Sequence, residues 1–224
     1  MQTFTVSLSL IRAARTHAAE KDLRYWLQGV YFDTKHGKLV ATDGHRMLIA
    51  SASGIQSSVA PFIISNETLD AVLSQYKGDY GRGKRLGDVD ITVTVSDEMT
   101  VSFNTPIGLI SGKPVDGTFP DYRRVIPKPE DVMTEKPAVF NQTYIHEAFD
   151  AILVARNKTL KAASNYAVKV FGFGESCGVV TDGSGGVVVI VMPIRNEIHS
   201  ECAAAACREA LSETVADTQT AVAA

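Results

Sequence analysis

Hydrophobic residues recur along this chain with two different periods, and the order of those periods predicts three similar units. Apolar positions at spacings of three and four predict helices at residues 7–21, from Asn66 onward and from Thr143 onward. After each helix, apolar and polar residues alternate, which is typical of strands that bury one face. The pattern therefore predicts an α+β fold built from repeated helix-plus-strands units.

The predicted strands follow their helices closely, and residues 1–6 predict one more strand at the start of the chain. Ser65 or Asn66 is suited to cap the second helix, because short polar side chains accept hydrogen bonds from free N–H groups at a helix start. The remaining predicted strands are residues 24–33, 38–42, 46–53, 89–95, 99–103, 167–173, 178–181 and 186–192.

Composition agrees with a cytoplasmic protein. The chain has 224 residues, 45% of them hydrophobic, a mean hydropathy of +0.03 and a formal net charge of −3. It contains no apolar run near the roughly 20 residues that a membrane span needs, and its start has no signal-peptide pattern. The three cysteines, Cys177, Cys202 and Cys207, are too few for a disulfide framework, which fits a reducing compartment.

Four short sequence islands follow one another in a fixed order: RYWLQG at 24–29, ATDGHR at 41–46, TFPDYRRVIP at 118–127 and VMPIR at 191–195. Together they resemble the bacterial β sliding clamp family, the processivity subunit of DNA polymerase III. The resemblance extends over residues 1–195. It implies the DNA-clamp fold, in which helices line a central hole and antiparallel sheets form the outer wall.

The resemblance also suggests how the chain is divided. Residues 1–127 resemble the clamp's middle domain, and residues 128–195 resemble a shortened last domain that keeps only its second half. A proline-interrupted, charged connector at 128–131 joins the two. Residues 196–224 form a tail that we expect to be partly helical or disordered.

A clamp must hold duplex DNA without stopping on it, and this requires phosphate contacts in place of base contacts. Tyr25 and Trp26 match an aromatic pair that touches DNA in the family, and basic residues surround them. Packing in the sheet and solvated charge are the alternative explanations. The basic loop 77–85 is a weaker candidate. The predicted DNA-binding residues are Arg12, Arg15, Lys21, Arg24, Tyr25 and Trp26.

The second site implied by the resemblance is a groove that captures short peptides of replication proteins. Such a groove needs an apolar trough with a few polar anchors, and Gly44 would permit a backbone turn that directs His45 and Arg46 toward it. The predicted lining is Leu27, Thr42, Gly44, His45, Arg46, Met47, Pro120, Arg124, Val125, Ile190, Val191, Met192, Pro193, Ile194 and Arg195.

The sequence gives little support for an enzyme active site. Asp43 and His45 lack a serine or cysteine in a nucleophile context. The segment 182–186 precedes a predicted strand and therefore lacks the helix start of a phosphate-binding loop, so we interpret it as a hairpin turn. His199, Cys202 and Cys207 have weak metal-ligand spacing. We expect no catalysis, no metal and no cofactor.

The interpretation is a DNA sliding clamp that encircles double-stranded DNA without sequence preference and binds a polymerase and a clamp loader through linear motifs. A family ring holds about twelve helix-plus-strands units, so three units in each chain favour a homotetramer over a trimer. The alternative is a clamp-derived interaction scaffold that no longer encircles DNA. No membrane partner is expected.

Overall fold

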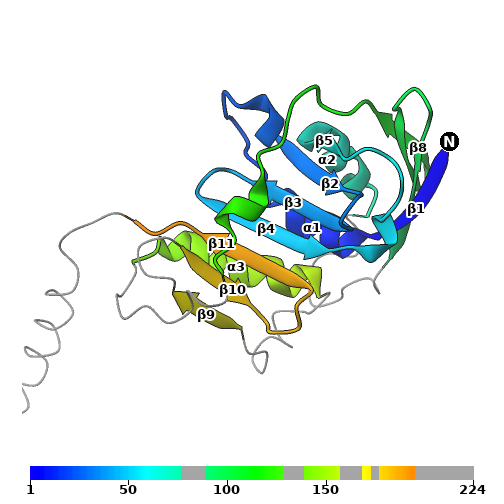
Figure 1. The fold of residues 1–224 in the computed structure, drawn as a ribbon. Helices are drawn as coiled ribbons and strands as arrows, with labels where there is room; N and C mark the ends of the chain where they lie inside the picture. The colour runs from blue at the N-terminus through cyan, green and yellow to red at the C-terminus, as the bar shows by residue number, and fades with distance from the viewer. Residues whose placement is uncertain (77–88, 129–138, 157–167, 173–176, 195–224) are drawn as a thin grey trace, which may run out of the picture.

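The structure, a computed structural model, describes residues 1–76, 89–128, 139–156, 168–172 and 177–194. Two antiparallel sheets and three α-helices make up this part of the chain (Figure 1). No helix among the described residues is long and apolar enough to cross a membrane. The observed α+β architecture with antiparallel sheets confirms the fold class predicted from the sequence.

The first 112 residues contain two successive helix-plus-strands units. The first is β1 (Gln2–Ser7), α1 (Leu8–Arg15), a 3-10 turn (Tyr25–Leu27), β2 (Gly29–Asp33), β3 (Lys38–Thr42), β4 (Arg46–Ser51), a second 3-10 turn (Ser53–Ile55) and β5 (Phe62–Ser65). The second is α2 (Asn66–Ser74), β6 (Asp90–Val95), β7 (Val101–Thr105) and β8 (Gly108–Gly112). Strand β1 leaves its own unit and pairs with β6, which ties the two units together.

The third unit follows a connecting segment, which the structure describes over residues 113–128 and which contains a further 3-10 turn (Tyr122–Val125). It consists of α3 (Gln142–Ala155), β9 (Lys169–Gly172), β10 (Gly178–Thr181) and β11 (Val187–Val191). Its last strand pairs antiparallel with β4, so that the first and third units share one seven-stranded sheet in the order β5-β2-β3-β4-β11-β10-β9. A separate four-stranded sheet has the order β1-β6-β7-β8.

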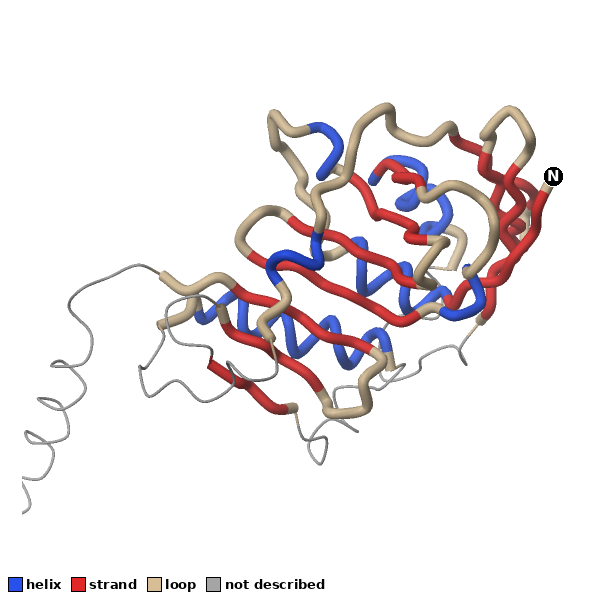
Figure 2. The backbone as a smooth tube through the Cα atoms, viewed as in Figure 1, coloured by secondary structure: helices blue, strands red, loops and turns tan. Residues whose placement is uncertain are grey.

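The helices cover one face of the seven-stranded sheet (Figure 2). Helix α1 packs against both α2 and α3, and Ser9 on α1 donates a hydrogen bond to the carbonyl of Ala155 at the end of α3. The main core lies between helices and sheets, and it includes Ile11, Leu48 and Ile152, all fully buried. A second apolar cluster lies on the opposite, outer face of the same sheet.

Strand alternation explains both clusters. Along β3 and β4, Leu39, Ala41, Leu48 and Ala50 belong to the core against the helices, whereas Val40 and Met47 belong to the outer cluster. Successive side chains of a strand point to opposite faces, and here both faces are apolar. Because the outer face lies away from the helices, its apolar side chains need another cover.

Helix starts follow the sequence prediction closely. Ser65 caps α2 by accepting a hydrogen bond from the N–H of Thr68, and Asn141 caps α3 by accepting from the N–H of Thr143. The first helix was predicted too long, because it ends at Arg15 instead of Lys21. Residues 25–27, predicted as strand, form a 3-10 turn. Strands β5 and β8 were not predicted.

Candidate functional site

The turn between β3 and β4 is built by side chains that hydrogen-bond to their own backbone. Asp43 Oδ1 accepts from the N–H groups of His45 and Arg46 at 2.9 and 3.0 Å, and Thr42 Oγ1 accepts from the N–H of Gly44 at 3.0 Å. Gly44 has φ +92°, a left-handed conformation that glycine adopts without a steric penalty. The turn leaves His45 exposed and directs Arg46 inward.

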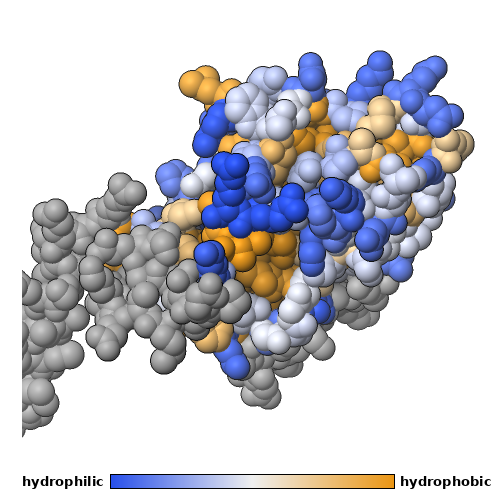
Figure 3. Space-filling model, viewed as in Figure 1, coloured by the Kyte–Doolittle hydropathy of each residue, from blue (hydrophilic) through white to orange (hydrophobic). Residues whose placement is uncertain are grey.

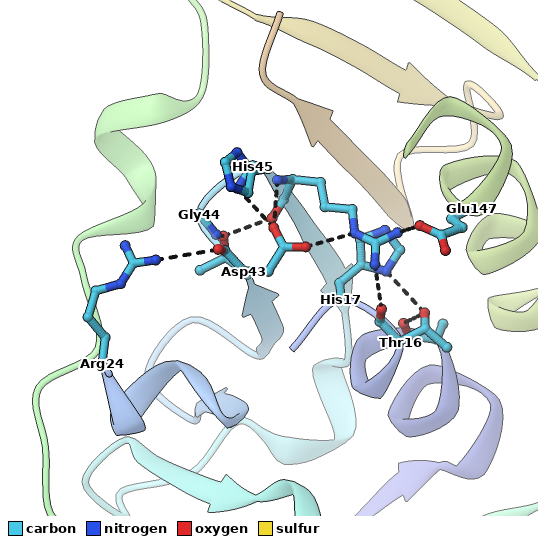
Figure 4. Close-up of polar contacts among 10 residues, drawn as sticks. Thr16, His17, Arg24, Asp43, Gly44, His45 and Glu147 are labelled. Atoms are coloured by element: carbon cyan, nitrogen blue, oxygen red, sulfur yellow. Dashed lines mark hydrogen bonds and ion pairs between the residues drawn. The ribbon is translucent and has the colours of Figure 1, made fainter. Parts of the chain in front are cut away.

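Arg46 contacts three parts of this region: the β3–β4 turn, the residue that follows α1, and α3 (Figure 4). Its Nε donates to Asp43 Oδ2 at 3.1 Å, one Nη donates to Glu147 on α3, and the other donates to the carbonyl of Thr16 after α1 at 3.3 Å. Its guanidinium also lies over the ring of Tyr144 on α3, 5.3 Å from the ring centre. The side chain is only 12% exposed. Arg46 therefore holds the first and third units together.

His17 lies directly beneath this ion-pair cluster and is fully buried. Its Nδ1 lies 3.1 Å from the hydroxyl oxygen of Thr16, while its Nε2 has no hydrogen-bond partner among the described residues. Burial, reinforced by the positive charge of Arg46, lowers the pKa of His17 to about 4. The imidazole is therefore neutral near pH 7, and the cation beside it is that of Arg46.

The end of β11 folds onto the same turn. The N–H of Met192 donates to the carbonyl of His45 at 2.8 Å, and the N–H of Ile194 donates to the carbonyl of Val139 at 2.7 Å. The β4–β11 register places Ile190 opposite Met47. His45 in turn stacks on the ring of Tyr144, with 5.9 Å between the ring centres. Segments that lie far apart in the sequence thus meet around the turn between β3 and β4.

The connecting segment covers part of the outer sheet face and is fixed there by aromatic and polar contacts. Phe119 stacks on Tyr31 of β2 at 4.8 Å, and the hydroxyl of Tyr122 donates to Asp33 Oδ2 at 2.9 Å. Burial alone would raise the pKa of Asp33, but hydrogen bonds from His36 and Tyr122 lower it overall. This anchoring positions Pro120, Arg124 and Val125, three of the residues predicted to line the groove.

The structure separates the predicted groove residues by burial and by face of the sheet. Leu27, Met47 and Ile190 are at most 4% exposed and form an apolar floor. Val191 points to the opposite face and is fully buried against the helices, so it does not line the outer face, because neighbouring strand residues alternate. Arg195 lies outside the described residues. The other predicted lining residues are at least partly exposed and lie at the β3–β4 turn, on the connecting segment and after β11: Thr42, Gly44, His45, Arg46, Pro120, Arg124, Val125, Met192, Pro193 and Ile194.

Sequence reasoning missed the contribution of α3 to this site. Tyr144 lies against His45 and Arg46, and Glu147 pairs with Arg46. Glu147 is 101 positions away from Arg46, so local spacing gives no sign of the contact. The pairing also changes the expected role of Arg46: its guanidinium is used within the protein and is not directed at a passing peptide.

The predicted DNA-binding residues do not form one basic surface. Arg15 makes a two-point ion pair with Asp70 on α2 and a further one with Glu20. Arg24 pairs with Asp22, whose pKa its hydrogen bonds lower to about 2. Arg12 lies half-buried on α1. A phosphate contact by Arg15 or Arg24 would have to compete with carboxylates already in place.

Of the other candidates for DNA contact, Lys21 and Tyr25 are exposed, and Tyr25 is 52% exposed. Trp26 packs against the outer apolar cluster, with its ring centre 5.1 Å from that of Tyr25. The Trp26 side chain is therefore packed against the protein and is not freely exposed for contact with DNA. The helices themselves carry Arg12 and Arg15 on α1 but Glu67 and Asp70 on α2, and Glu147 and Asp150 on α3.

Two of the remaining sequence predictions concern other chemistry. Residues 182–186 lie in the turn between antiparallel β10 and β11, which confirms the hairpin interpretation. The basic loop 77–85, the residues His199, Cys202 and Cys207, and the tail all lie outside the described residues. Within the described part, no group of three or more histidine, cysteine or acidic side chains is arranged to hold a metal ion.

Comparison with known proteins relates this chain to one family. Over 126 residues, which is 54% of this chain, it is 35% identical to the beta sliding clamp of Escherichia coli K12, and over 152 residues it is 32% identical to that of Pseudomonas putida. The chain is homologous to the bacterial β sliding clamp. It spans only about a third of these relatives, covering 32% and 38% of their lengths. No family model matches the chain.

Solved structures support the clamp fold over a larger part of the chain. The beta sliding clamp of Caulobacter crescentus matches with a TM-score of 0.57 and 20% identity, covering 87% of this chain and 66% of that one. A DNA polymerase sliding clamp from Pseudomonas aeruginosa gives the same TM-score at 19% identity. At this identity the likeness concerns the fold alone. This chain therefore shares the fold of these clamps over about two thirds of their length.

Proposed function

We propose that this protein is a non-catalytic DNA sliding clamp of the cytoplasm that encircles duplex DNA and tethers a replicative polymerase through short apolar peptides. The observation that carries the proposal is the closure of the Met-Pro end of β11 onto the turn after β3, through the hydrogen bond from Met192 to His45. This closure gathers an apolar floor and polar rim on one outer face. An extended peptide requires that combination.

The groove is tested by removing its apolar side chains from the rim. Ile194 is 45% exposed and Met192 is partly exposed, so Met192→Ala with Ile194→Ala removes contact area and leaves the core in place. Loss of apolar anchors in such pockets costs roughly 2 to 4 kcal/mol of binding energy. We expect the double variant to lose stimulation of a polymerase while its unfolding curve stays unchanged. Full stimulation by a folded double variant would refute the groove assignment.

DNA contact is tested at the exposed residues near the 3-10 turn. Arg24→Glu with Tyr25→Ala leaves the partly buried Trp26 in place, and Trp26→Ala is made separately because it also removes packing. Phosphate and stacking contacts carry no base code. We expect weaker retention on DNA and a shallower salt dependence, with no change in sequence preference. Retention that ignores both the substitutions and salt would argue against this face.

Ring formation is supported by the free strand edges of the two sheets. Among the described residues, β8 and β9 each have one unpaired side, and exposed apolar residues lie at or beside them: Ile107, Leu109, Val170 and Phe171. Unprotected edges of this kind favour pairing with another chain. Counting three units in each chain, we propose a homotetramer in preference to a trimer. Light scattering tests this, because a tetramer has four times the 24.1 kDa mass of one chain.

One observation favours a second candidate function. The described helices carry four acidic residues and two arginines, one of which is held by carboxylates. A clamp-derived scaffold that binds the same peptides without encircling DNA is consistent with that charge. A monomer that binds peptide and is not retained on circular DNA would support the scaffold. A closed oligomer that is retained on circular DNA and lost on linear DNA would support the clamp.

A further inference from the structure

The two sides of the molecule expose different kinds of side chain. On the sheet side, Figure 3 shows an apolar patch over β11, directly below a group of hydrophilic side chains. On the helix side, α2 buries Leu69, Val72 and Leu73 and exposes Glu67 and Asp70. Both charged residues of α2 are thus exposed carboxylates, although a protein that holds DNA needs cations to attract phosphate.

Arg15, the last residue of α1, is held by carboxylates from two directions. Its Nε and Nη2 donate to the two carboxylate oxygens of Asp70 at 2.9 and 2.7 Å, and its Nη1 donates to Glu20 at 2.7 Å. The Arg15 side chain is 12% exposed, whereas those of Asp70 and Glu20 are 55% and 70% exposed. The cation is thus largely covered, and its two anionic partners face the solvent.

Asp70 occupies an edge of the Arg15 guanidinium that suits a phosphate equally well. Nε and Nη2 present two parallel N–H groups, and this fork matches two oxygens of either a carboxylate or a phosphate. Asp70 and a phosphate therefore exclude each other from this edge. Glu20 pairs with Nη1, so removal of Asp70 would leave the two parallel donors open.

The charges around Arg15 strengthen this exclusion. Arg15 forms a cluster of one positive and two negative charges with Asp70 and Glu20. Two further cations lie close in sequence: Lys21, which is exposed beside Glu20, and Arg12, whose Nε and Nη2 are buried. A phosphate at Arg15 would still have two carboxylates as immediate neighbours, and their repulsion would weaken the contact.

Structural support does not account for this cluster. Ile11 on α1 and Leu69 on α2 are fully buried in the same core, so apolar burial already fixes both helices. Ion pairs with exposed partners add little to stability. The cluster therefore affects the charge that this surface presents more than it affects folding.

We propose that Asp70 is a positioning residue that keeps the Arg15 guanidinium from pairing with DNA phosphate, and so limits how tightly the protein holds a duplex. A protein that slides must hold DNA through contacts that break easily, and a free arginine fork would add a strong one. The inference rests on the proposed function, because it requires the helix side to face the duplex.

The test measures binding of the full chain to a fluorescently labelled DNA duplex by anisotropy at several salt concentrations. Each phosphate contact adds about 0.9 to the slope of log affinity against log salt concentration. Asp70→Asn removes the charge and keeps the shape of the side chain. We expect it to steepen the slope by about 0.9 and to tighten binding roughly tenfold at about 0.1 M salt. Asp70→Ser, which also lacks the charge, should behave alike.

Two controls separate this effect from a general change of charge. Glu67→Gln removes a carboxylate from the same exposed side of α2, whereas the ion-pair partners of Arg15 are Asp70 and Glu20. It should tighten binding less than about twofold and leave the slope unchanged, because screened charges act weakly at a distance. In an Arg15→Gln background, Asp70→Asn should have only that small effect. Urea unfolding checks that each variant is folded.

The possible results distinguish the inference from the proposed function. An unchanged slope in folded Asp70→Asn, while the wild type binds the duplex, would overturn the inference and leave the proposed function standing. The same steepening in Glu67→Gln, or from Asp70→Asn in the Arg15→Gln background, would show a general charge effect and would also overturn it. Absence of duplex binding by the wild type and by every variant would count against both.

Discussion

The two faces of the seven-stranded sheet are made by the same strands and yet have different tasks. On the inner face, Leu39, Leu48 and Val189 are fully buried against the helices. On the outer face, Val40 and Ile190 are buried in a cluster that includes Phe119 and Tyr122 of the connecting segment, while Ile49 and Val188 keep part of their surface in water. A strand that is apolar on both sides can thus build a core and offer a binding surface at once.

The largest expected effect comes from comparing neighbours on the two faces. Leu48 is fully buried on the inner face, and Ile49, the next residue, is partly exposed on the outer one. Leu48→Ala should lower the free energy of unfolding by about 2 to 5 kcal/mol, because it leaves a cavity. Ile49→Ala should cost about 1 kcal/mol, because less area is lost. Urea unfolding of both variants measures the difference, and equal losses would contradict the division between faces.

Acid should lower the free energy of unfolding through His17, which is buried on the helix side of the sheet. The unfolded chain binds a proton with the ordinary histidine pKa of 6.5, whereas the folded chain binds it only near pH 4. Between these values the unfolded state holds more protons, so stability falls as pH falls through that window and is unaffected by His17 above it. The total loss is on the order of 3 kcal/mol. Unfolding free energies at pH 7 and pH 4.5 should differ less in His17→Leu than in wild type.

A smaller loss of stability is expected from breaking the ion pair between Glu147 on α3 and Arg46. Glu147→Gln removes the charge that faces the Arg46 guanidinium but keeps a hydrogen-bond acceptor, and we expect a loss of about 1 to 2 kcal/mol. Asp150→Asn on the same helix is the control, because the partner of Asp150 within the described residues is the exposed His146 at 3.6 Å. Thermal melts should separate the two variants. A control that melts as low as Glu147→Gln would show a general charge effect on α3.

The smallest effect concerns the turn between β3 and β4. Gly44→Ala should cost about 1 kcal/mol, since alanine is strained at φ +92°. Its methyl group would also lie 2.9 Å from a guanidinium nitrogen of Arg24, a flexible group that can move. Gly183 has φ +78°, and a methyl group there would have no neighbour within 4 Å in the described part of the chain, so Gly183→Ala reports strain alone. Melting curves compare the two, and a much larger loss in Gly44→Ala would mean that Arg24 is fixed.

Much of the fold could be predicted from the sequence, because helix caps and strand alternation are set by neighbouring residues. Helix α3 begins where Asn141 offers a cap, and β6 alternates buried and exposed residues as its pattern indicates. The missed strands lacked those signals: β5 is a four-residue apolar run without alternation, and β8 begins and ends in glycine. Helix α1 ends at Arg15, before the apolar periodicity of the sequence ends, so periodicity alone does not give its last residue.

The candidate site was harder to predict than the fold. Motifs indicated the turn at Gly44 and the end of β11, but not the partners that restrain them. Tyr144 and Glu147 come from another unit, and their contact with Arg46 depends on how α3 packs. For the same reason, Arg15 had the charge expected of a phosphate contact, yet Asp70 on a neighbouring helix already occupies it. Charge can be counted in a sequence, but its neutralisation depends on tertiary structure.

The pairing of β4 with β11 has a consequence for how the chain folds. Ser51 and Gly185, which meet at that junction, are 134 positions apart, so the edge of β4 has no partner until most of the chain has been synthesised. Contacts of such long range slow folding, and an open strand edge promotes misassociation meanwhile. During translation, the first two units therefore expose the sheet edge that the third unit will cover. Rapid docking of α3 on α1 would shorten that exposure by delivering β11 to its place.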